Sequence, residues 1–434
     1  MHIRETRKYD VVVCGCGVAG FSAAVAAGRQ GKKVALVERQ GMPGGILTVG
    51  GNDEIALFFA HKHLVIKGIG WEFSKELVRR GYGVMPDWHT ETRHPALGVK
   101  VNPLAAASLM DEWMTAAGVE LYYNQPVVDC DVSDGRVERV IIGAKQGPVA
   151  LEAKTFVDCT GDADLCAFAG ADIECGDPET GDLMPGTLRY YQQQIPNTPD
   201  TLQKIAASFK AARADGRLRY RDLWNEGPDS TGDLLYFHDG NNIGHVMHYN
   251  AADSDSLTQA EIRGRQSVMR VSDWIRGNGL GGEIITAAPN VASRESRRVV
   301  CDTRVAAEDY VAGRMYDDAV CYSFYPIDLH KAEGGCLFNI FIEEGVYPTL
   351  PLSMMIPTKL SNVLVAGRCA SGDRLAQSAF RVKSSCMAMG EAAGVTAALA
   401  GDGEVRGVPV GEVRTVLRRN GCLVPPDAPQ DEER

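Results

Sequence analysis

The chain has 434 residues, which predicts about two to three domains and an apolar core large enough to fold without disulfides. Apolar residues make up 45% of the chain and charged residues 23%, a balance that excludes an intrinsically disordered protein and a bundle of membrane helices. The net charge of −11 (45 Lys and Arg against 56 Asp and Glu) disfavours a nucleic-acid partner, because no local basic stripe offsets it.

The 12 cysteines are scattered singly, with no CxxC pair and no Cys/His spacing of the zinc or ferredoxin kind. This usage predicts a cytoplasmic protein without a metal site. The apolar stretch over residues 11–28 contains glycines and precedes no small-residue cleavage site, so we expect a folded element there and not a signal peptide. No other window approaches about 18 uninterrupted apolar residues, so we expect no membrane span.

The N-terminus predicts a strand–helix–strand unit. Residues 9–14 (YDVVVC) are a short β-branched run, residues 19–29 form an alanine-rich helix, and residues 33–38 (KVALVE) are typical of a second strand.

A further helix and a β-meander follow. Asn102 and Pro103 suit the N-cap and the first position of a helix over residues 104–117, and residues 119–124 (VELYYN) are typical of a strand. Residues 126–157 alternate in short segments broken by turn residues, which predicts a β-meander that ends in a buried strand, TFVDC.

Residues from about 170 to 347 are richer in polar loops, aromatics and histidines, which indicates a second domain. Thr258 and Glu261 have the spacing of a capping box, so we expect a helix to begin at Thr258. Residues 362–366 (NVLVA) predict a last core strand, and residues 384–399 predict a buried helix that returns the chain to the first domain.

Gly15, Gly17 and Gly20 form a GxGxxG pattern between the first strand and the first helix. Gly15 permits a tight turn, Gly17 lets the backbone approach a pyrophosphate, and Gly20 lets the helix pack closely on the strand. Glu38 ends the second strand, where a carboxylate accepts hydrogen bonds from a ribose and repels the 2′-phosphate of NADP. The pattern predicts a site for FAD or NAD, the alternative being a glycine turn without a ligand.

A second match to this pattern, from Gly277 to Gly282, has the reverse context, because a helix precedes it and a strand follows it. We interpret it as a helix end and a loop. The sequence then contains no separate nicotinamide domain.

Three further segments distinguish FAD from NAD. They are residues 41–45 (GMPGG), residues 159–164 (CTGDAD), and residues 363–369 (VLVAGRC) with the following 377–382 (QSAFRV). At these motifs the sequence resembles the FAD-dependent oxidoreductases of the glutathione-reductase structural class, specifically the bacterial group with a single FAD domain that is distantly related to fumarate reductase flavoproteins. The resemblance spans residues 9–400.

The resemblance implies an α/β fold, in which a Rossmann-like FAD-binding domain carries a β-meander insertion and an inserted α+β substrate domain. We place the FAD-binding domain at residues 1–170 and 351–402, and the substrate domain at residues 171–350. A C-terminal extension with a disordered tail is expected at residues 403–434.

The resemblance also implies which residues contact FAD. It assigns the glycine turn and the end of the second strand to the ADP half, Val127 to the adenine, the GMPGG glycines to the side of the flavin, and the last motif to the ribityl chain and pyrimidine edge. A helix N-terminus there would stabilise the reduced flavin. Cys14 and Cys16 stand where small aliphatic residues are usual, and we expect no disulfide between them. In chain order the expected FAD-binding residues are Gly15, Gly17, Gly20, Glu38, Arg39, Gly44, Gly45, Val127, Thr160, Gly161, Gly367, Arg368, Ser378, Arg381 and Val382.

Two segments resemble the family's Arg-rich segment and the His-bearing loop that follows it, namely residues 293–298 (SRESRR) and 325–330 (YPIDLH). His330 is the first candidate for the proton donor or acceptor, because an unperturbed imidazole titrates near neutral pH. Arg294 is the candidate anion clamp, and Arg297 is the second candidate. The alternatives are a structural hydrogen-bonding role for His330 and a surface ion pair for Arg297.

Five other histidines are weaker candidates. His238, His245 and His248 cluster in the sequence, but no carboxylate at a fixed short spacing supports a metal site. His61 and His63 follow the GMPGG segment, where they could gate the pocket.

We therefore expect a FAD-dependent oxidoreductase that transfers a hydride between a small polar organic substrate and flavin N5, with the direction left open. The oligomeric state, including a homo-oligomer, is also open. Two alternatives remain, an NAD-linked dehydrogenase and a non-catalytic FAD-binding electron-transfer subunit.

Overall fold

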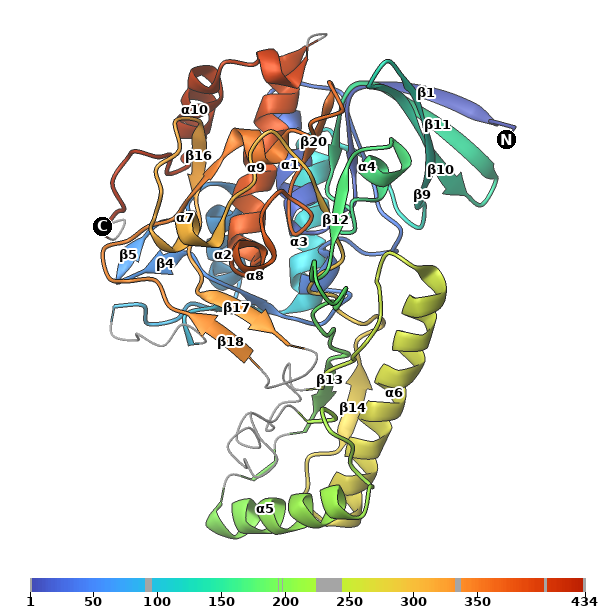
Figure 1. Cartoon of the computed structure of the whole chain (residues 1–434), viewed down its shortest axis with the longest axis vertical. Helices are drawn as coiled ribbons and strands as arrows, with labels where there is room; N and C mark the ends of the chain where they lie inside the picture. The colour runs from blue at the N-terminus through green and yellow to red at the C-terminus, as the bar shows by residue number, and fades with distance from the viewer. Residues whose placement is uncertain are drawn as a thin grey trace.

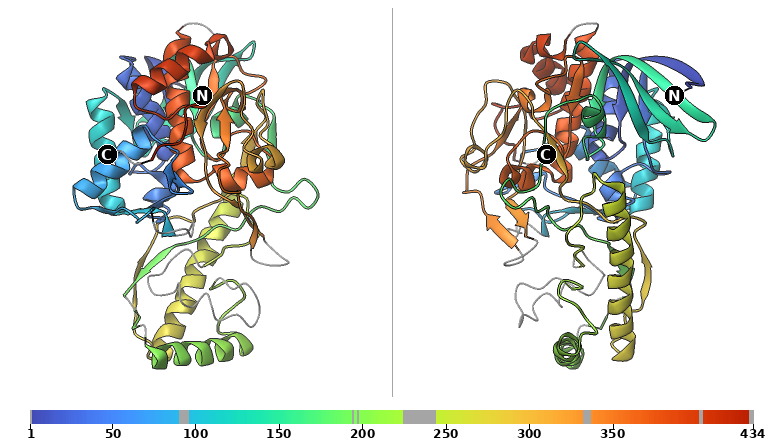
Figure 2. Two further views of the ribbon diagram at one scale, coloured as in Figure 1. Left: turned by 90° about the vertical axis from the view of Figure 1, so that its left-hand side faces the viewer. Right: turned by 45° about the vertical axis from the view of Figure 1, so that its right-hand side comes forward.

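The protein consists of a larger body and a long arm. The structure is a computed structural model that describes residues 2–89, 96–193, 195–196, 198–223, 244–331, 337–401 and 404–431. The body contains the main sheet with α1 (Val18–Arg29) and α9 (Lys383–Ala400) (Figure 1). The arm contains β13 (Tyr190–Gln192), α5 (Pro199–Ala214), α6 (Ser254–Gly277) and β14 (Ile284–Ala287). Figure 2 shows that α6 runs along the arm and that α5 crosses its far end.

A seven-stranded sheet forms the centre of the body, with the order β8–β2–β1–β11–β10–β9 and with β20 also paired to β11. Its parallel strands are β8 (Glu120–Tyr122), β2 (Val34–Val37), β1 (Glu5–Cys14), β11 (Gly147–Asp158) and β20 (Val363–Val365). The predicted strand–helix–strand unit is β1–α1–β2, and the predicted last strand is β20. The Rossmann-like α/β fold is confirmed.

The β-meander is also present, with one difference in its last strand. β9 (Val127–Ser133) and β10 (Arg136–Ala144) are antiparallel to each other, and β10 is antiparallel to the first half of β11. The second half of β11 pairs with β20. The predicted buried strand TFVDC is the end of the longer strand β11, whose pairing with β1 runs from Val149 to Asp158.

The predicted helix after Asn102 is α3 (Pro103–Ala116), and the Asn102 side-chain oxygen accepts a hydrogen bond from the N–H of Ala105 at 3.0 Å. The predicted buried helix is α9, whose residues are buried from Ser384 to Ala398. Both predictions are confirmed. Helix α2 (Ile69–Arg79) lies in a segment for which the sequence predicted no element.

Helices α1 and α9 cross in very close contact. A Cβ added to Gly390 would lie 2.1 Å from the carbonyl oxygen of Ala19, and one added to Gly394 would lie 2.2 Å from that of Ala23. Two glycines one helical turn apart thus let the backbones of α9 and α1 meet, which fixes the N-terminus of α1 against the body.

The remaining elements connect these parts. In the body they are η1 (Gly45–Leu47), β3 (Glu54–Ile55), β4 (Phe59–Ala60), β5 (His63–Leu64), β6 (Gly83–Val84), β7 (Val99–Val101), α4 (Asp164–Phe168), β12 (Ile173–Cys175), β15 (Arg297–Val299), α7 (Ala307–Val311), β16 (Ala319–Tyr322), β17 (Ile327–His330), β18 (Leu337–Ile340), β19 (Thr349–Pro351), η4 (Leu352–Met355), α8 (Arg374–Phe380), η5 (Val405–Gly407) and α10 (Val410–Arg419).

The start of α6 differs from the prediction. The helix begins at Ser254 and not at Thr258, because Asp253 caps it by accepting the N–H of Ser256 at 2.7 Å. The Glu261 carboxylate accepts the N–H of Val291 and therefore forms no capping box. The second glycine pattern does follow the end of α6 at Gly277, as predicted.

The apolar core has two parts. The arm has its own core between Leu188 and Val291, whereas residues from Val299 to Ala370 pack into the core of the body. The domain boundary near residue 350 stays a prediction. The C-terminal tail was expected to be disordered, but it packs on the body as far as residue 431. Gln430 exchanges two backbone hydrogen bonds with Leu64.

Candidate functional site

The glycine turn between β1 and α1 has the predicted geometry. Gly15 has a φ of +93°, and a Cβ there would lie 2.5 Å from the carbonyl oxygen of Cys159. A Cβ on Gly20 would lie 1.8 Å from the carbonyl oxygen of Gly15. A Cβ on Gly17, in contrast, meets no atom of the described chain within 4 Å. The turn therefore leaves open space in front of the first turn of α1.

The GMPGG segment packs directly on this turn. The N–H of Gly44 donates to the carbonyl oxygen of Cys16 at 2.7 Å, and a Cβ on Gly45 would lie 3.1 Å from Cα of Gly17. The structure thus brings Gly44 and Gly45 next to Gly17.

Glu38 is buried at the end of β2, and its carboxylate accepts the N–H groups of Cys16 at 2.7 Å and Gln40 at 2.8 Å. Burial raises the pKa of Glu38 above its usual value, and the two N–H groups oppose that rise. Glu38 therefore supports the glycine turn itself, in addition to any ligand. Val127 is the first residue of β9. The chain just before it lies beside the end of β2, because the N–H of Gln125 donates to the carbonyl oxygen of Glu38.

The CTGDAD segment forms a buried polar loop after β11. Thr160 donates from its N–H and its hydroxyl to the Asp158 carboxylate, at 3.0 and 2.7 Å. A Cβ on Gly161 would lie 3.0 Å from Nε of Arg368. Asp162 accepts hydrogen bonds from Arg368 at 2.5 Å and from Ser296 at 2.6 Å. Burial would raise the pKa of Asp162, but Arg368 and Arg39 outweigh it and hold this pKa below its usual value.

Arg368 and Arg297 hold this loop in place. Arg368 donates to Asp162 and, at 2.8 Å, to Ser296. Arg297 donates to the carbonyl oxygen of Asp162 at 3.3 Å and to the Asp164 carboxylate at 3.1 Å. Arg297 thus binds the CTGDAD loop, whereas His330 belongs to a different cluster. The structure therefore gives no support to Arg297 as a substrate residue. Arg39 lies nearby and half exposed, with its guanidinium 3.8 Å from Asp162.

The predicted substrate residues Arg294 and His330 belong to a second cluster. Asp328 and His330 alternate on β17 and share one face, with Nε2 of His330 3.3 Å from the Asp328 carboxylate. Nδ1 of His330 lies 3.0 Å from Nε2 of His245. The Arg381 guanidinium lies 3.7 Å from the Asp328 carboxylate. Ser378 on α8 accepts the N–H of Asp328 at 3.0 Å, which ties β17 to the helix before α9.

The charges in this cluster follow from its burial. Burial and the nearby Arg294 lower the pKa of His330 to about 4, so its imidazole is neutral at pH 7. Burial would raise the pKa of Asp328, but His330, Arg381 and Arg294 lower it to about 2. Burial and Arg381 lower the pKa of Arg294 to about 10, which leaves the guanidinium charged.

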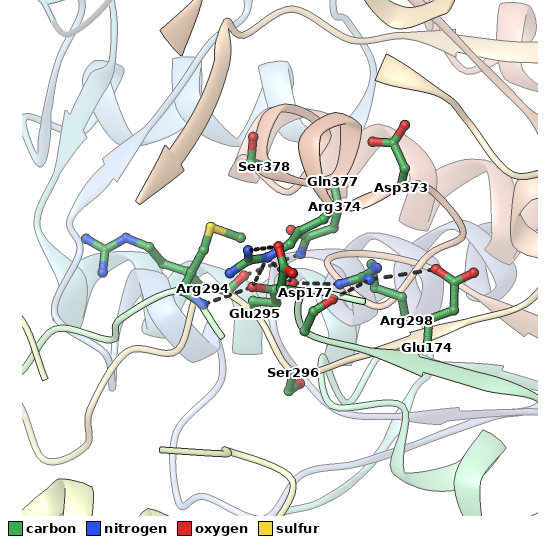
Figure 3. A network of polar contacts seen from close by, with 12 residues as sticks. Glu174, Asp177, Arg294, Glu295, Ser296, Arg298, Asp373, Arg374, Gln377 and Ser378 are labelled. Atoms are coloured by element: carbon green, nitrogen blue, oxygen red, sulfur yellow. Dashed lines mark hydrogen bonds and ion pairs between the residues drawn. The ribbon is translucent and has the colours of Figure 1, made fainter. Parts of the chain in front are cut away.

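Arg294 is oriented by the loop before the arm. Its Nη1 donates to the carbonyl oxygen of Pro185 at 2.7 Å and to the Thr187 hydroxyl at 3.0 Å. Gln377 on α8 donates to the carbonyl oxygens of Arg294 and Arg368 and so joins the two clusters. Figure 3 shows that the Arg294 side chain points away from the ion pairs that Glu295 makes.

Sequence reasoning did not assign roles to Asp162 and Asp328, and it weighed His245 only as a metal ligand. The Asp-x-His spacing on a strand signalled Asp328, since alternate residues share a face, and the CTGDAD motif contained Asp162. His245 had no such signal, because only the tertiary structure brings it to His330. His238 lies outside the described residues.

The described residues contain no group of three His, Cys, Asp or Glu side chains that could hold a metal ion. His248 is exposed, and His63 contacts Asp431 at 2.6 Å. The ring of His61 lies edge-on to Phe324. Among the same residues, no helix combines the length and apolar character that crossing a membrane requires.

Comparison with known proteins identifies the family. A family model described as FAD dependent oxidoreductase matches residues 10–417. The chain therefore belongs to the FAD-dependent oxidoreductase family, and FAD is its cofactor. Dihydrolipoyl dehydrogenase 3 of Pseudomonas putida is 32% identical over 166 residues, which are 36% of this chain and 31% of that protein. The chain thus matches about a third of this relative.

Two solved structures are also similar. A geranylgeranyl bacteriochlorophyll reductase-like protein from Thermoplasma acidophilum is 12% identical with a TM-score of 0.42, over 96% of this chain and 83% of that one. The anhydrotetracycline hydroxylase OxyS from Streptomyces rimosus is 14% identical with a TM-score of 0.45, over 95% of this chain and 66% of that one.

The residues present fit FAD. The first turn of α1 has no side-chain cap, so its N–H groups face the space in front of Gly17. At the end of the site where the flavin is expected, Nε of Arg381 is a buried donor with no hydrogen-bond partner among the described residues. Val382, the next residue, begins α9 as its N-cap and provides no side-chain cap. The N–H of Ser384 in the first turn of α9 donates to the carbonyl oxygen of Ala56, so the open donors are those of α1 and the Arg381 side chain, where we expect the pyrophosphate and the flavin.

Gly17→Ala is expected to weaken FAD binding by about tenfold or more while leaving the fold intact. The new methyl group meets no atom of the described chain but occupies the space where the pyrophosphate would lie. The dissociation constant of FAD and the melting temperature of the apoprotein test this. Loss of apoprotein stability without loss of FAD affinity would contradict the assignment.

Proposed function

We propose that the protein transfers a hydride between a small organic anion and the flavin of FAD, and that the histidine cluster on β17 exchanges the proton. The observation that carries this proposal is the cluster next to the start of α9, in which the buried Arg294 and His330 lie with the partly buried Asp328 and Arg381. Oxidation of an alcohol or amine, or reduction of an alkene, requires both a hydride and a proton.

The charge of the cluster supports an anionic substrate. Two guanidinium groups face one carboxylate, and His330 is neutral, so the cluster carries one excess positive charge. A carboxylate group of the substrate would balance this charge in a site shielded from water. We assign Arg294 to this contact.

The protein and the cofactor divide the chemistry. Bound FAD supplies the hydride acceptor or donor. Asp328 keeps His330 in one orientation, and the histidine exchanges the proton that accompanies the hydride. Arg297 and Arg368 hold the CTGDAD loop and contact no substrate in this proposal.

Anaerobic absorbance spectroscopy tests the proposal. The purified protein should show a flavin spectrum that bleaches with one class among hydroxy, amino and saturated carboxylates, or, once reduced, recovers with an unsaturated carboxylate. The matching amides, which lack the negative charge, are the control and should react far more slowly. Equal reaction with acids and amides would contradict the anion clamp. A flavin that dithionite reduces but no member of the panel affects would favour an electron-transfer subunit.

A further inference from the structure

The GGNDE segment (residues 50–54) leads from η1 into β3 and is tied to the GMPGG glycines. The N–H of Gly50 donates to the carbonyl oxygen of Gly45 at 3.0 Å, and the N–H of Asn52 donates to that of Ile46 at 2.9 Å. A shift of the GGNDE segment would therefore also move the glycines beside which we expect the flavin.

The base of the arm holds the GGNDE segment. Arg189, which is 7% exposed and precedes β13, donates from Nη1 to the Asp53 carboxylate at 2.6 Å. The hydroxyl of Tyr191 on β13 donates to the carbonyl oxygen of Gly51 at 3.2 Å. Gly51 has a φ of +72°, and a Cβ there would lie 3.0 Å from Cβ of Ala288 at the end of β14. The positive φ and the close approach thus both favour glycine where the arm touches the segment.

The start of α9 holds the same segment. Lys383, the first residue of α9, donates from its ammonium group to the Asn52 side-chain oxygen at 2.9 Å and to the carbonyl oxygen of Glu54 at 2.6 Å. The hydroxyl of Ser384 donates to the carbonyl oxygen of Ala56 at 2.7 Å, just beyond the segment. Two parts of the chain that are far apart in sequence, the arm and α9, therefore meet at these five residues.

The contacts join two cations to two acidic residues. Burial lowers the pKa of Lys383 to about 8, while Glu54 and Asp53 oppose this change, so the ammonium group is mostly charged at pH 7. Burial raises the pKa of Glu54, and Lys383 opposes that rise. Arg189 pairs with Asp53, whose side chain is 25% exposed. Loss of either cation would thus remove both a hydrogen bond and a balancing charge from the segment.

We propose that Arg189 and Lys383 are positioning residues for FAD, which hold the GGNDE segment, and through it the GMPGG glycines, in the arrangement that receives the flavin. The inference rests on the expected position of the flavin beside these glycines and does not depend on the substrate. A segment that is ordered before binding adds no ordering cost when the ligand arrives, so FAD binds more tightly. Because Arg189 belongs to the base of the arm, the arm contributes to FAD affinity through this contact.

Titration of the apoproteins of R189Q and K383Q with FAD tests the proposal. Each variant should bind FAD about tenfold more weakly than the wild type, as expected for loss of one hydrogen bond to a charged group. Glutamine removes the positive charge without leaving a buried cation unpaired. R270Q is the matched control, because Arg270 pairs with Asp222 inside the arm, also at 2.6 Å. Among the described residues, no hydrogen bond or ion pair joins Arg270 to the GGNDE segment, so R270Q should keep the FAD affinity of the wild type.

Hydrogen exchange of the apoproteins separates positioning from a general loss of stability. The amides of Gly50 and Asn52 should exchange faster in R189Q and K383Q than in the wild type, and at the wild-type rate in R270Q. At saturating FAD, the visible circular dichroism of the bound flavin should change in R189Q and K383Q but not in R270Q.

Two outcomes would overturn the proposal. Wild-type FAD affinity in R189Q or K383Q would show that the altered residue does not position FAD. An equal loss of affinity in R270Q would show that any disturbance of the arm weakens FAD binding, so that the contact with the GGNDE segment has no particular role. A wild-type flavin inert to every carboxylate would instead defeat the proposed function and leave these binding measurements unchanged.

Discussion

Gly394→Ala is expected to destabilise the protein by about 3 kcal/mol and to reduce its FAD content. The added methyl group would lie 2.2 Å from the carbonyl oxygen of Ala23, a backbone atom that cannot move away by a side-chain rotation. The helices α9 and α1 must then separate. Because α1 carries the glycine turn at its N-terminus, their separation also disturbs the FAD site. Chemical denaturation and the ratio of flavin to protein after purification measure the two effects.

Gly411→Ala on α10 is the matched control. No atom of the described chain lies within 4 Å of a Cβ at this position, so the alanine should stabilise the helix by about 0.5–1 kcal/mol. If Gly394→Ala were as stable as this control, the close crossing of α1 and α9 would be wrong.

Glu295→Ala is expected to destabilise the protein by about 3 kcal/mol, because it removes the buried carboxylate between Arg298 and Arg374 and leaves them only the more exposed Glu174 and Asp177 as partners. The Glu295 side chain is fully buried and pairs with Arg298 at 2.6 Å and with Arg374 at 3.0 Å. It also accepts the N–H of Met184 at 2.9 Å. The same carboxylate thus joins β15, α8 and the loop before the arm (Figure 3). Equilibrium unfolding in urea measures the loss.

Glu76→Ala is the control for Glu295. Glu76 also pairs with two arginines, Arg79 and Arg80, but at the surface of α2. Water screens such pairs, so we expect a much smaller change in the urea midpoint. Similar urea midpoints for the two variants would show that burial does not increase the contribution of the Glu295 network to stability. A loss of kcat in Glu295→Ala at a temperature where it is folded would show that the network also positions Arg294.

The segment SRESRR illustrates what a local pattern cannot resolve. The sequence indicates a run of arginines at the substrate side, but the three guanidinium groups have different partners in the structure. Arg298 pairs with Glu295, Arg297 contacts Asp164, and only Arg294 belongs with His330. The partners of Arg294 and Arg297, Pro185 and Asp164, are more than a hundred residues away in sequence, and no pattern within the segment indicates them.

The sequence by itself determined the Rossmann-like sheet, the FAD turn and the buried return helix. Their signals are local, because a strand, a glycine turn and a helix N-terminus are encoded within about 30 consecutive residues. Only the tertiary structure decided which ionisable side chains meet. His245 reaches His330 across 85 positions of the chain, and Arg368 reaches Asp162 across 206. Such pairs follow from how the sheet and the arm pack, and burial then fixes their charges, which no short pattern in the sequence encodes.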